Sequence, residues 1–406
     1  MKKTVWLFIS LLFLVSACSC PFSKTKEDKN ITQLKELSDN VKQNYAPDRR
    51  SKIFEATFKA DTTAQGVVYI VKGATTQPEA KAALVAAAKE KGITLLDSIK
   101  MLPDPALKEK TYGISSLSVT NFRNSPSHSA EMDTQTLMGM PVRILEKRGS
   151  WWRVVTPEGY ISWSNVGVQA MSKEEYDAWN KADKIIITIH YTLFREQPSA
   201  TAGIVMDGVW GNIVQAAGEQ GVYYKVVLPN GKTAFVPKSD AQKYNDWLKQ
   251  RNPTAANIIA TAKQFIGFPY LWGGTSIKAV DCSGFVKSCF YLNGVIVPRD
   301  ASQQAQAGEE VDLSNGLDKL QPGDLLYFGS KATETSRERV THTAIYIGNG
   351  QFIHSASSPA SVVINSLIKG QPDYSTTAES LIRSKRYTHL IDKDKEIVSI
   401  KNHPWY

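Results

Sequence analysis

An internal repeat limits the folds that this chain of 406 residues can adopt. Two segments match each other with a period of 72 residues: VRILEKRGSWWRVVTPEGYISWSNVG (142–167) and IVQAAGEQGVYYKVVLPNGKTAFVPKSDA (213–241). Each copy consists of short runs of alternating polar and apolar residues that end at glycine turns, which is typical of small antiparallel structures. The repeat predicts two small β-barrels, at 113–170 and 183–241, of which the second is interpreted as a spacer.

The sequence around the repeat predicts further domains, because a chain of this length does not fold around one core. Residues 31–110 combine strand-like runs with a helical stretch, PEAKAALVAAAKEKG, that starts at Pro78 and stops at Gly92. We expect a small α/β region there, and the sequence assigns it no chemistry. A linking helix, KEEYDAWNKADK, is predicted between the barrels, and a last domain at 250–392.

The N-terminus has the features of an export signal. Lys2 and Lys3 precede an apolar run, VWLFISLLFLV, which is too short for a membrane helix and ends in small residues before Cys18. The ending LVSAC resembles a lipobox, in which the cysteine becomes the acylated N-terminus. The pattern predicts a lipoprotein signal peptide at 1–17, lipidation at Cys18 and a polar tether at 18–30. We therefore expect an exported protein that is lipid-anchored in the cell envelope, which in a Gram-negative cell means the periplasm or outer membrane.

The charge of the chain argues against a nucleic-acid partner. The formal net charge is +9, and the signal peptide holds two lysines and no acid, which leaves +7 in the mature chain. These charges are spread along the sequence, without a run of like charges that would form a basic arm. Mild attraction to an acidic cell envelope is the interpretation that fits an exported protein.

The cysteine count indicates a free thiol. With Cys18 lipidated, three of the four cysteines remain, an odd number for a chain in a compartment that permits disulfides. Cys282 and Cys289 are seven residues apart, about 10 Å along one helix, which is too far for a disulfide. At least one exported thiol therefore stays reduced, and such a thiol is a candidate for chemistry.

Cys282 occupies a position that suits a nucleophile, in the stretch DCSGFVKSC (281–289). Phe285, Val286 and Cys289 follow it on one stripe of an amphipathic helix, and Asp281 is a natural N-cap. Cys282 then lies in the first turn, where free backbone N–H groups and the helix dipole favour a thiolate. An ordinary buried cysteine fits the same local sequence, so the pattern alone leaves both interpretations open.

A cysteine nucleophile needs a base, which histidine usually supplies. Of six histidines, His342 and His354 lie downstream in VTHTAIYIGNGQFIHSAS, two alternating strands joined by a Gly-Asn-Gly turn that predicts a hairpin. If Ile347 pairs with Gln351, His342 is the diagonal neighbour of His354 on one sheet face, with ~7–8 Å between Cα atoms. The spacing thus predicts that one imidazole orients the other.

Six motifs between residues 254 and 390 resemble NlpC-type cell-wall cysteine peptidases, in the order of that family. The motifs are PYLWGG (269–274), VDCSGFV (280–286), PRDASQQ (298–304), LQPGDLLYF (320–328), THTAIYIGNG (341–350) and FIHSAS (352–357). The resemblance implies a papain-like α+β fold and no metal or other cofactor. It also implies roles for Cys282 as nucleophile, His342 as base, His354 as the group that orients the base, and Tyr270 as a partner of the oxyanion.

Both repeat copies resemble bacterial SH3-like barrels, so the expected fold is α+β: a small N-terminal α/β region, two SH3-like β-barrels and the peptidase domain. This arrangement resembles the branch that cuts the γ-D-glutamyl to diamino-acid bond of peptidoglycan peptides with a free N-terminal L-alanine. In that branch the first barrel closes one end of the cleft. The resemblance implies that Glu131, Tyr160 and Asp300 hold the substrate's amine. The other implied substrate contacts are Trp272, Asp281, Ser283 and Ser302.

One residue departs from the family pattern, because Ala301 follows Asp300 where relatives often carry serine. We expect a monomer whose partners are a peptidoglycan-derived peptide and, through the lipid anchor, a membrane. Two alternatives stay open: an envelope-anchored lipoprotein that binds muropeptides without cutting them, and the same fold acting as an amidase or acyltransferase on another substrate. Diaminopimelate and lysine are both compatible with the third position of the peptide.

Overall fold

The computed structural model describes residues 28–64 and 66–406. The predicted signal peptide, the lipidation site Cys18 and most of the predicted tether lie outside these residues. The first helix, α1 (Lys29–Tyr45), is capped by Asp28, whose carboxylate accepts a hydrogen bond from the Asn30 N–H at 2.9 Å. The tether therefore ends before Lys29, earlier than predicted, because the capped helix includes its last residues.

The N-terminal domain combines two helices with a three-stranded sheet. The sheet order is β1-β2-β3, with β1 and β2 antiparallel and β2 and β3 parallel. Pro78 is the first residue of α2, where its missing N–H costs no hydrogen bond. Apolar residues of both helices and the sheet form one core. The elements after α1 are β1 (Phe54–Thr63), β2 (Gly66–Thr75), α2 (Pro78–Glu90), β3 (Leu95–Met101) and the short helix η1 (Pro105–Leu107).

Two seven-stranded sheets follow, and they have the same topology. The order of the first is β10-β4-β7-β8-β9-β5-β6 and that of the second is β17-β11-β14-β15-β16-β12-β13. Each strand of the second sheet thus has the place of the strand seven numbers earlier in the first. The first comprises β4 (Tyr112–Ser115), β5 (Val119–Arg123), β6 (Met132–Leu137), β7 (Pro141–Arg148), β8 (Trp151–Val155), β9 (Ile161–Ser164) and β10 (Val168–Met171). The second comprises β11 (Lys184–Ile187), β12 (Tyr191–Arg195), β13 (Ile204–Val209), β14 (Ile213–Gln220), β15 (Tyr223–Val227), β16 (Thr233–Pro237) and β17 (Ala241–Lys243).

Short helices connect these sheets to each other and to the last domain. The predicted linking helix is α3 (Lys173–Lys181), which begins at a capping box formed by Ser172 and Glu175. Helix α4 (Tyr244–Lys249) follows the second sheet. None of the helices in the described part of the chain is long and apolar enough to cross a membrane.

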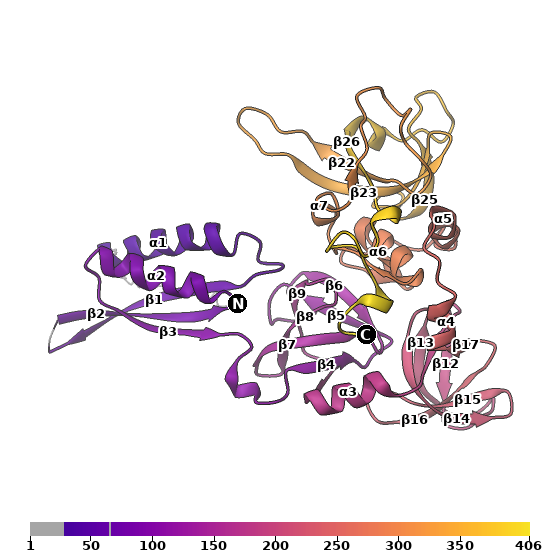
Figure 1. The fold of residues 1–406 in the computed structure, drawn as a ribbon, viewed down its shortest axis with the longest axis horizontal. Helices are drawn as coiled ribbons and strands as arrows, with labels where there is room; N and C mark the ends of the chain where they lie inside the picture. The colour runs from indigo at the N-terminus through magenta and orange to yellow at the C-terminus, as the bar shows by residue number, and fades with distance from the viewer. Residues whose placement is uncertain (1–27, 65) are drawn as a thin grey trace, which may run out of the picture.

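The last domain packs helices against a six-stranded sheet of order β21-β26-β22-β23-β24-β25 (Figure 1). Helix α6 (Cys282–Leu292) is buried along its whole length and contacts β23 and β24. The sheet comprises β21 (Glu309–Glu310), β22 (Leu325–Ser330), β23 (Arg339–Gly348), β24 (Gln351–Ala356), β25 (Ser361–Ser366) and β26 (Leu381–Arg386). The remaining elements are α5 (Ala255–Lys263), β18 (Thr275–Ser276), β19 (Ala279–Val280), β20 (Val295–Ile296), α7 (Ala301–Gln304), η2 (Thr376–Ser380), η3 (Thr388–Leu390), β27 (Val398–Ser399) and η4 (Ile400–Asn402).

This domain extends beyond the predicted boundary at residue 392. Strand β27 pairs with β20, and His403 Nε2 lies 3.0 Å from the carbonyl oxygen of Pro157 in the first barrel. The sequence after residue 392 was not assigned to the domain because its strand is only two residues long and its partner lies about a hundred positions earlier.

The β23–β24 hairpin has the predicted register along its length but not at its turn. Ile345 pairs with Ile353, as expected, whereas Gln351 pairs with Gly348 instead of Ile347. A bulge at Ile347 accounts for the difference, since it places one extra residue in β23 without shifting the pairs beyond it. The two histidines consequently approach each other as the sequence predicts.

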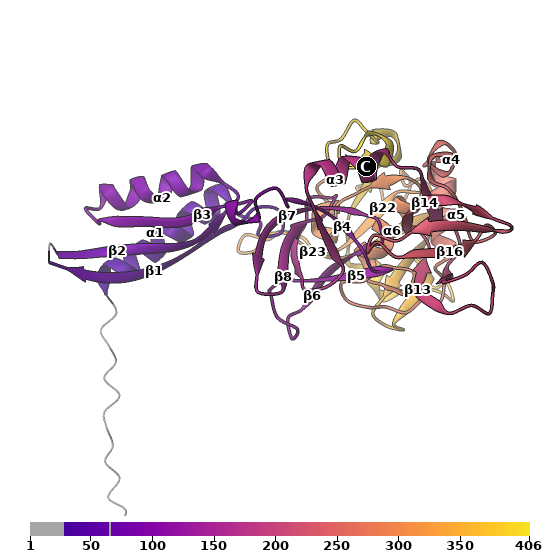
Figure 2. The ribbon, with the colours of Figure 1, turned by 90° about the horizontal axis from the view of Figure 1, so that it is seen from below.

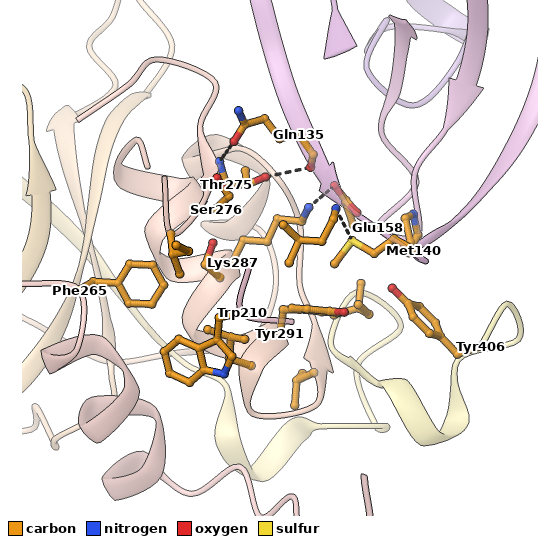
Figure 3. Close-up of a pocket in the computed structure, with 17 residues that line it drawn as sticks. Gln135, Met140, Glu158, Trp210, Phe265, Thr275, Ser276, Lys287, Tyr291 and Tyr406 are labelled. Carbon is orange, nitrogen blue, oxygen red and sulfur yellow. Dashed lines mark hydrogen bonds and ion pairs between the residues drawn. The ribbon is translucent and has the colours of Figure 1, made fainter. Parts of the chain in front are cut away.

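The first barrel and the peptidase domain share a polar and closely packed interface (Figure 3). Thr275 binds Gln135 twice, through its N–H at 2.9 Å and its hydroxyl at 2.8 Å. Lys287 on α6 forms an ion pair with Glu158 at 2.8 Å, with side chains only 7% and 2% exposed. The cavity left between these residues is about 20 Å³, enough for roughly one water molecule, so it is no site for a substrate.

The N-terminal domain extends to one side of the molecule and contacts the first barrel at its inner end (Figure 2). Ile53 and Leu102 pack with Leu145 and Ile161 of the barrel in one buried cluster. Polar contacts support this packing, because Glu55 forms ion pairs with Arg148 and Arg153 on the barrel. The turn between α1 and β1 is thereby brought to the edge of the peptidase domain.

Candidate active site

Helix α6 places Cys282 in its first turn, which confirms the predicted position. Asp281 is the N-cap, and its Oδ1 accepts a hydrogen bond from the Gly284 N–H at 2.6 Å. Cys282 is almost completely buried, at 9% exposure. Its sulfur accepts hydrogen bonds from the backbone N–H groups of Ser283 and Thr343, so it lies against β23 next to His342.

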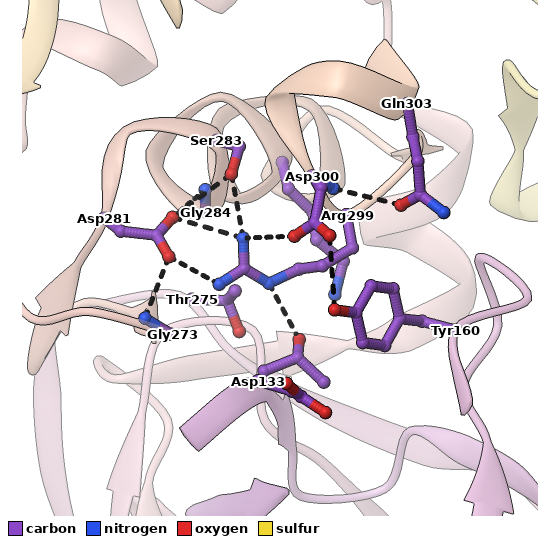
Figure 4. Close-up of polar contacts among 12 residues, drawn as sticks. Asp133, Tyr160, Gly273, Thr275, Asp281, Ser283, Gly284, Arg299, Asp300 and Gln303 are labelled. Atoms are coloured by element: carbon purple, nitrogen blue, oxygen red, sulfur yellow. Dashed lines mark hydrogen bonds and ion pairs between the residues drawn. The ribbon is translucent and has the colours of Figure 1, made fainter. Parts of the chain in front are cut away.

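Hydrogen-bond donors of the protein itself occupy nearly all the acceptor positions of the Asp281 carboxylate (Figure 4). Arg299 donates to its Oδ2 at 2.6 Å and to its Oδ1 at 3.2 Å, and the Gly273 N–H donates to Oδ2 at 2.9 Å. With the cap bond and a contact from Ser283 Oγ at 3.3 Å, five donors meet a group that has about four acceptor positions. The geometry favours a structural role for Asp281 over the direct substrate contact that the sequence analysis expected.

Burial decides the protonation of Cys282 in the unliganded site. It raises the pKa of the thiol to about 12, and the negative charge of Asp281 raises it further, whereas the two backbone N–H groups lower it. Burial of the sulfur therefore opposes the thiolate that the helix N-terminus favours. The helix N-terminus does stabilise negative charge, but the loss of water around the sulfur outweighs it.

His342 and His354 contact each other directly, with 2.6 Å between Nε2 of His342 and Nδ1 of His354. On its other side, His354 Nε2 lies 2.9 Å from Oδ1 of Asn365 on β25. An amide oxygen only accepts, so His354 carries its proton on Nε2 and accepts the proton of His342 Nε2 at Nδ1. This arrangement leaves Nδ1 of His342 without a proton, so this nitrogen is the one that can accept a proton.

His342 is a neutral base in this environment. Burial lowers its pKa to about 3, and the neighbouring His354 lowers it as well. The pKa of His354 is also lowered by burial, while the bond to Asn365 raises it. Cys282 and His342 therefore rest as a neutral thiol and a neutral imidazole, and transfer of the proton accompanies attack on the substrate.

The cleft in front of Cys282 has a volume of about 490 Å³. It is formed by three parts of the chain: the peptidase domain, the first barrel and the turn between α1 and β1. The predicted catalytic and substrate-binding residues line it, with the exception of His342 and His354. The predicted residues that line it are Glu131, Tyr160, Tyr270, Trp272, Asp281, Cys282, Ser283, Asp300 and Ser302.

One end of the cleft is rich in carboxylates. The Tyr160 hydroxyl donates to Oδ2 of Asp300 at 3.2 Å, and Glu131 and Asp133 lie on the same side. Burial raises the pKa of Asp133, and the negative charges of Asp300 and Glu131 raise it further. These groups come from two domains, since Asp300 precedes α7 and the other three belong to the first barrel. A cationic group would find several partners here.

Tyr270 remains a hydroxyl donor at the opposite wall. Burial raises its pKa, as do the nearby Cys282 and Asp281. A protonated phenol next to the sulfur can donate to a negatively charged oxygen that forms beside it. In the part of the chain that the structure describes, no group of three or more His, Cys, Asp and Glu side chains is arranged to hold a metal ion.

Sequence reasoning missed four residues of the site: Arg50, Asp133, Arg299 and Asn365. Arg299 directly precedes Asp300 in the motif PRDASQQ. An arginine next to an expected substrate-binding carboxylate is a pattern from which its role could have been predicted. Asn365 lies two positions after Val363, which pairs with His354, so a correct third strand would have placed it on the same face. Asp133 and Arg50 carried no signal, because their relation to the cleft depends on how separate domains pack.

A thiol in the first turn of a buried helix and a neutral imidazole with a fixed tautomer define the catalytic equipment of a cysteine peptidase. The comparisons with known proteins agree. Residues 267–379 match the model of the NlpC/P60 family, and residues 122–164 match that of the bacterial dipeptidyl-peptidase Sh3 domain. The chain belongs to the NlpC/P60 family and is a cysteine-type hydrolase, which confirms the resemblance found in its motifs.

Relatives in bacilli extend this match over most of their length. A gamma-D-glutamyl-L-lysine dipeptidyl-peptidase of Bacillus cereus is 32% identical over 246 residues, 59% of this chain and 71% of that protein. A protein with the same name from Bacillus subtilis is 33% identical over 58% of this chain and 76% of its own. The crystal structure of an NlpC/P60 family protein from Bacillus cereus superposes with a TM-score of 0.57 and 26% identity, over 68% of this chain and 99% of that one.

These findings confirm the predicted α+β architecture of a papain-like peptidase domain with an SH3-like domain. The family model of the SH3-like domain covers the first of the two seven-stranded sheets. The second sheet has the same strand order, and its assignment as a second SH3-like domain remains a prediction based on that topology.

Proposed function

We propose that this enzyme hydrolyses the amide bond between γ-D-glutamate and the diamino acid of peptidoglycan stem peptides that have a free N-terminal L-alanine. The names of the two bacillar relatives support this class of substrate. The observation that carries the proposal is the carboxylate-rich end of the cleft, where Asp300, Tyr160 and Glu131 can surround an ammonium group. The products are the dipeptide L-Ala-γ-D-Glu and the rest of the stem peptide, as in cell-wall peptide turnover or recycling.

The proposed reaction begins with attack of Cys282 Sγ on the carbonyl carbon of the γ-glutamyl bond. As the S–C bond forms, the thiol proton moves to Nδ1 of His342, whose Nε2–H is held by His354. The carbonyl oxygen becomes an oxyanion that the Cys282 N–H and the Tyr270 hydroxyl stabilise. His342 then gives its proton to the departing amine, which breaks the C–N bond and leaves a thioester.

Hydrolysis of the thioester reverses these proton transfers. Neutral His342 removes a proton from water, and the resulting hydroxide attacks the thioester carbon. When the C–S bond breaks, His342 returns the proton to sulfur and the carboxylate of the dipeptide is released. His354 and Asn365 keep the same proton positions throughout, so they orient the base without exchanging a proton with the substrate.

Selectivity in this proposal follows from charge. A free amine can pair with Asp300 and with the carboxylates beside it, whereas an acetylated or glycan-linked peptide brings no cation to this end of the cleft. The expected effect is a loss of kcat/KM on the order of 10²-fold, the free energy of a charge-assisted contact of roughly 3 kcal/mol. The enzyme would accordingly act on released stem peptides and leave intact, cross-linked wall uncut.

The test is turnover of one defined tripeptide, L-Ala-γ-D-Glu-diamino acid, in its free and N-acetylated forms, with products identified by mass spectrometry. The lysine and diaminopimelate versions form a second pair that establishes the preference at the third position. We expect rapid release of L-Ala-γ-D-Glu from the free form only. Equal rates for free and acetylated peptide would contradict the role of the carboxylates, and cleavage at another bond would contradict the reaction.

We also propose that the mature enzyme is exported and lipid-anchored through Cys18. The support is the lipobox-like sequence LVSAC after a short apolar run, which lies outside the described residues. Metabolic labelling with a palmitate analogue tests this directly, with Cys18→Ala as the variant and Cys20→Ala as its control. Labelling that persists in Cys18→Ala would contradict the proposal.

A further inference from the structure

The turn between α1 and β1 lies in the wall of the peptidase cleft. Arg49 and Arg50 of this turn line the same cavity as Cys282, although they belong to the N-terminal domain, for which the sequence indicates no chemistry. The backbone carbonyl of Arg50 accepts a hydrogen bond at 2.7 Å from the N–H of Ile161 in the first barrel. The turn is thus fixed to the barrel at the residue whose side chain enters the cleft.

Arg50 binds the carboxylate that is proposed to hold the substrate's amine. Its Nη1 lies 2.8 Å from Oδ2 of Asp300 and 3.0 Å from the hydroxyl of Ser302. The opposite edge of the guanidinium binds Asp48, with Nε 2.8 Å from Oδ1 and Nη2 2.8 Å from Oδ2. This bidentate pair holds the planar group in one orientation, so that only Nη1 is directed at Asp300.

The two carboxylate oxygens of Asp300 have different surroundings, because Arg50 binds only one of them. Oδ2 is shared by Arg50 and the Tyr160 hydroxyl, whereas the only charged neighbour of Oδ1 among the described residues is Arg299, at 3.9 Å. Arg299 is itself paired with Asp281 (Figure 4). The Asp300 side chain also accepts the Gln303 N–H in a capping box, so Oδ1 offers an incoming ammonium group the acceptor positions that remain, while Oδ2 holds the carboxylate in place.

Arg50 also offsets the concentration of negative charge at this end of the cleft. Asp300, Glu131 and Asp133 lie close enough that the first two raise the pKa of the third. In the absence of a cation, such carboxylates repel one another and turn away or take up a proton. The guanidinium of Arg50, 2.8 Å from Oδ2 of Asp300, places a positive charge beside this group of carboxylates and holds Asp300 in position.

We propose that the N-terminal domain is a specificity module of this peptidase, in which Arg50 is a positioning residue that orients Asp300 toward the amine of the peptide substrate. The inference rests on the proposed function and extends it, since it assigns part of the amine-binding site to a domain outside the barrel and peptidase pair. It also gives a reason why this domain is attached to the first barrel by an apolar cluster and ion pairs to Glu55.

The test compares Arg50→Ala, Arg50→Lys and a control on the same turn, Lys52→Ala, whose exposed side chain does not line the cleft. Each protein is assayed with the free and the N-acetylated tripeptide. Arg50→Ala should raise KM for the free peptide roughly tenfold with kcat nearly unchanged, the effect of losing one charge-assisted contact. The already slow acetylated peptide should be unaffected, so the discrimination between the two falls by the same factor.

Arg50→Lys should restore part of the discrimination because it keeps the charge, and Lys52→Ala should behave as wild type. Asp48→Asn serves as a second variant that leaves Arg50 in place but releases it from its bidentate pair, and it should lower discrimination in the same direction. Thermal unfolding of each variant excludes loss of the fold as the cause.

Two results would overturn the inference. An unchanged KM and discrimination in Arg50→Ala would show that Asp300 needs no positioning, and a lower KM would show that the guanidinium competes with the substrate's amine. Binding of L-Ala-γ-D-Glu to Cys282→Ala, measured by calorimetry, separates this from failure of the proposed function. If that dipeptide does not bind and the tripeptide is not cleaved, the proposed function fails and the role of Arg50 falls with it.

Discussion

His354 donates its Nε2–H to Oδ1 of Asn365 at 2.9 Å, and this contact determines where the protons lie in the catalytic chain. The amide of Asn365 is itself held, because its Nδ2 donates to the carbonyl oxygen of Asp373 at 3.0 Å. The oxygen therefore faces His354, and each imidazole has one permitted tautomer. A neutral base with its free nitrogen at Nδ1 results from hydrogen bonds alone, without a carboxylate next to it.

Removal of the Asn365 amide should impair the base without removing it. We expect Asn365→Ala to lower kcat by roughly tenfold, because His354 loses its fixed tautomer and orients His342 less well. Asn365→Asp places a negative charge beside His354, which should raise the histidine pKa values and move the acid limb of the kcat/KM profile to higher pH. A pH profile of Asn365→Asp that matches wild type would contradict this role.

The three catalytic side chains should differ in how much activity their loss costs. Cys282→Ala should abolish hydrolysis with the fold intact, since the nucleophile disappears and little volume changes. His342→Ala should be nearly as severe. His354→Ala should be milder, at roughly 10²-fold in kcat, because it removes orientation and leaves the base. If His354→Ala were as inactive as Cys282→Ala, His354 would have to act on the reacting atoms.

The dependence of kcat/KM on pH should be that of a neutral Cys282 thiol beside a neutral His342 imidazole. A thiolate–imidazolium pair would lose activity below about pH 6. Burial instead lowers the pKa of His342 to about 3, so the base stays unprotonated as pH falls through the ordinary histidine range. We expect kcat/KM to be largely retained at pH 5, provided that the protein stays folded by circular dichroism.

A separate decline is expected on the alkaline side. The substrate's α-amine has an ordinary pKa of roughly 7.7–8.0, and its cationic form is the one that the carboxylates bind. The value of kcat/KM should therefore fall above about pH 8, through KM and not through kcat. An alkaline limb that appears in kcat as well would point to an enzyme group instead of the substrate's amine.

The Arg299–Asp281 pair should contribute strongly to stability. Both side chains are buried, at 2.6 Å between Nη2 and Oδ2, and Arg299 Nε also donates to Thr134 of the first barrel at 3.0 Å. Arg299→Ala leaves Asp281 as a buried charge without its partner, which should cost about 3–5 kcal/mol of unfolding free energy. Urea denaturation measures this loss, and Lys173→Ala in an exposed ion pair is the control that should leave the midpoint unchanged.

Contacts between residues that are close in the sequence could be predicted, whereas contacts between distant residues could not. Asp281 and Cys282 are adjacent, so their cap and helix position follow from local rules. His342 and His354 are joined by one tight turn, so their meeting follows from strand alternation even though the bulge at Ile347 was not foreseen. Asn365 required a third strand, whose pairing the local pattern does not specify.

The rest of the site depended on packing between domains. Arg50 and Asp300 are 250 positions apart, and only the docking of the N-terminal domain on the barrel brings them together. The pKa of the Cys282 thiol could not be predicted from the sequence for the same reason. Its helix position was predictable, but its pKa depends on how completely the folded chain excludes water from the sulfur.

The Lys287–Glu158 ion pair restricts how this peptidase domain can be recombined with other domains. Lys287 lies five residues after Cys282 on α6, and its buried partner is on the barrel. A gene fusion that exchanged the first barrel for one without this glutamate would bury an unpaired ammonium group beneath the catalytic helix. The barrel and the peptidase domain are therefore expected to be inherited and exchanged as one unit.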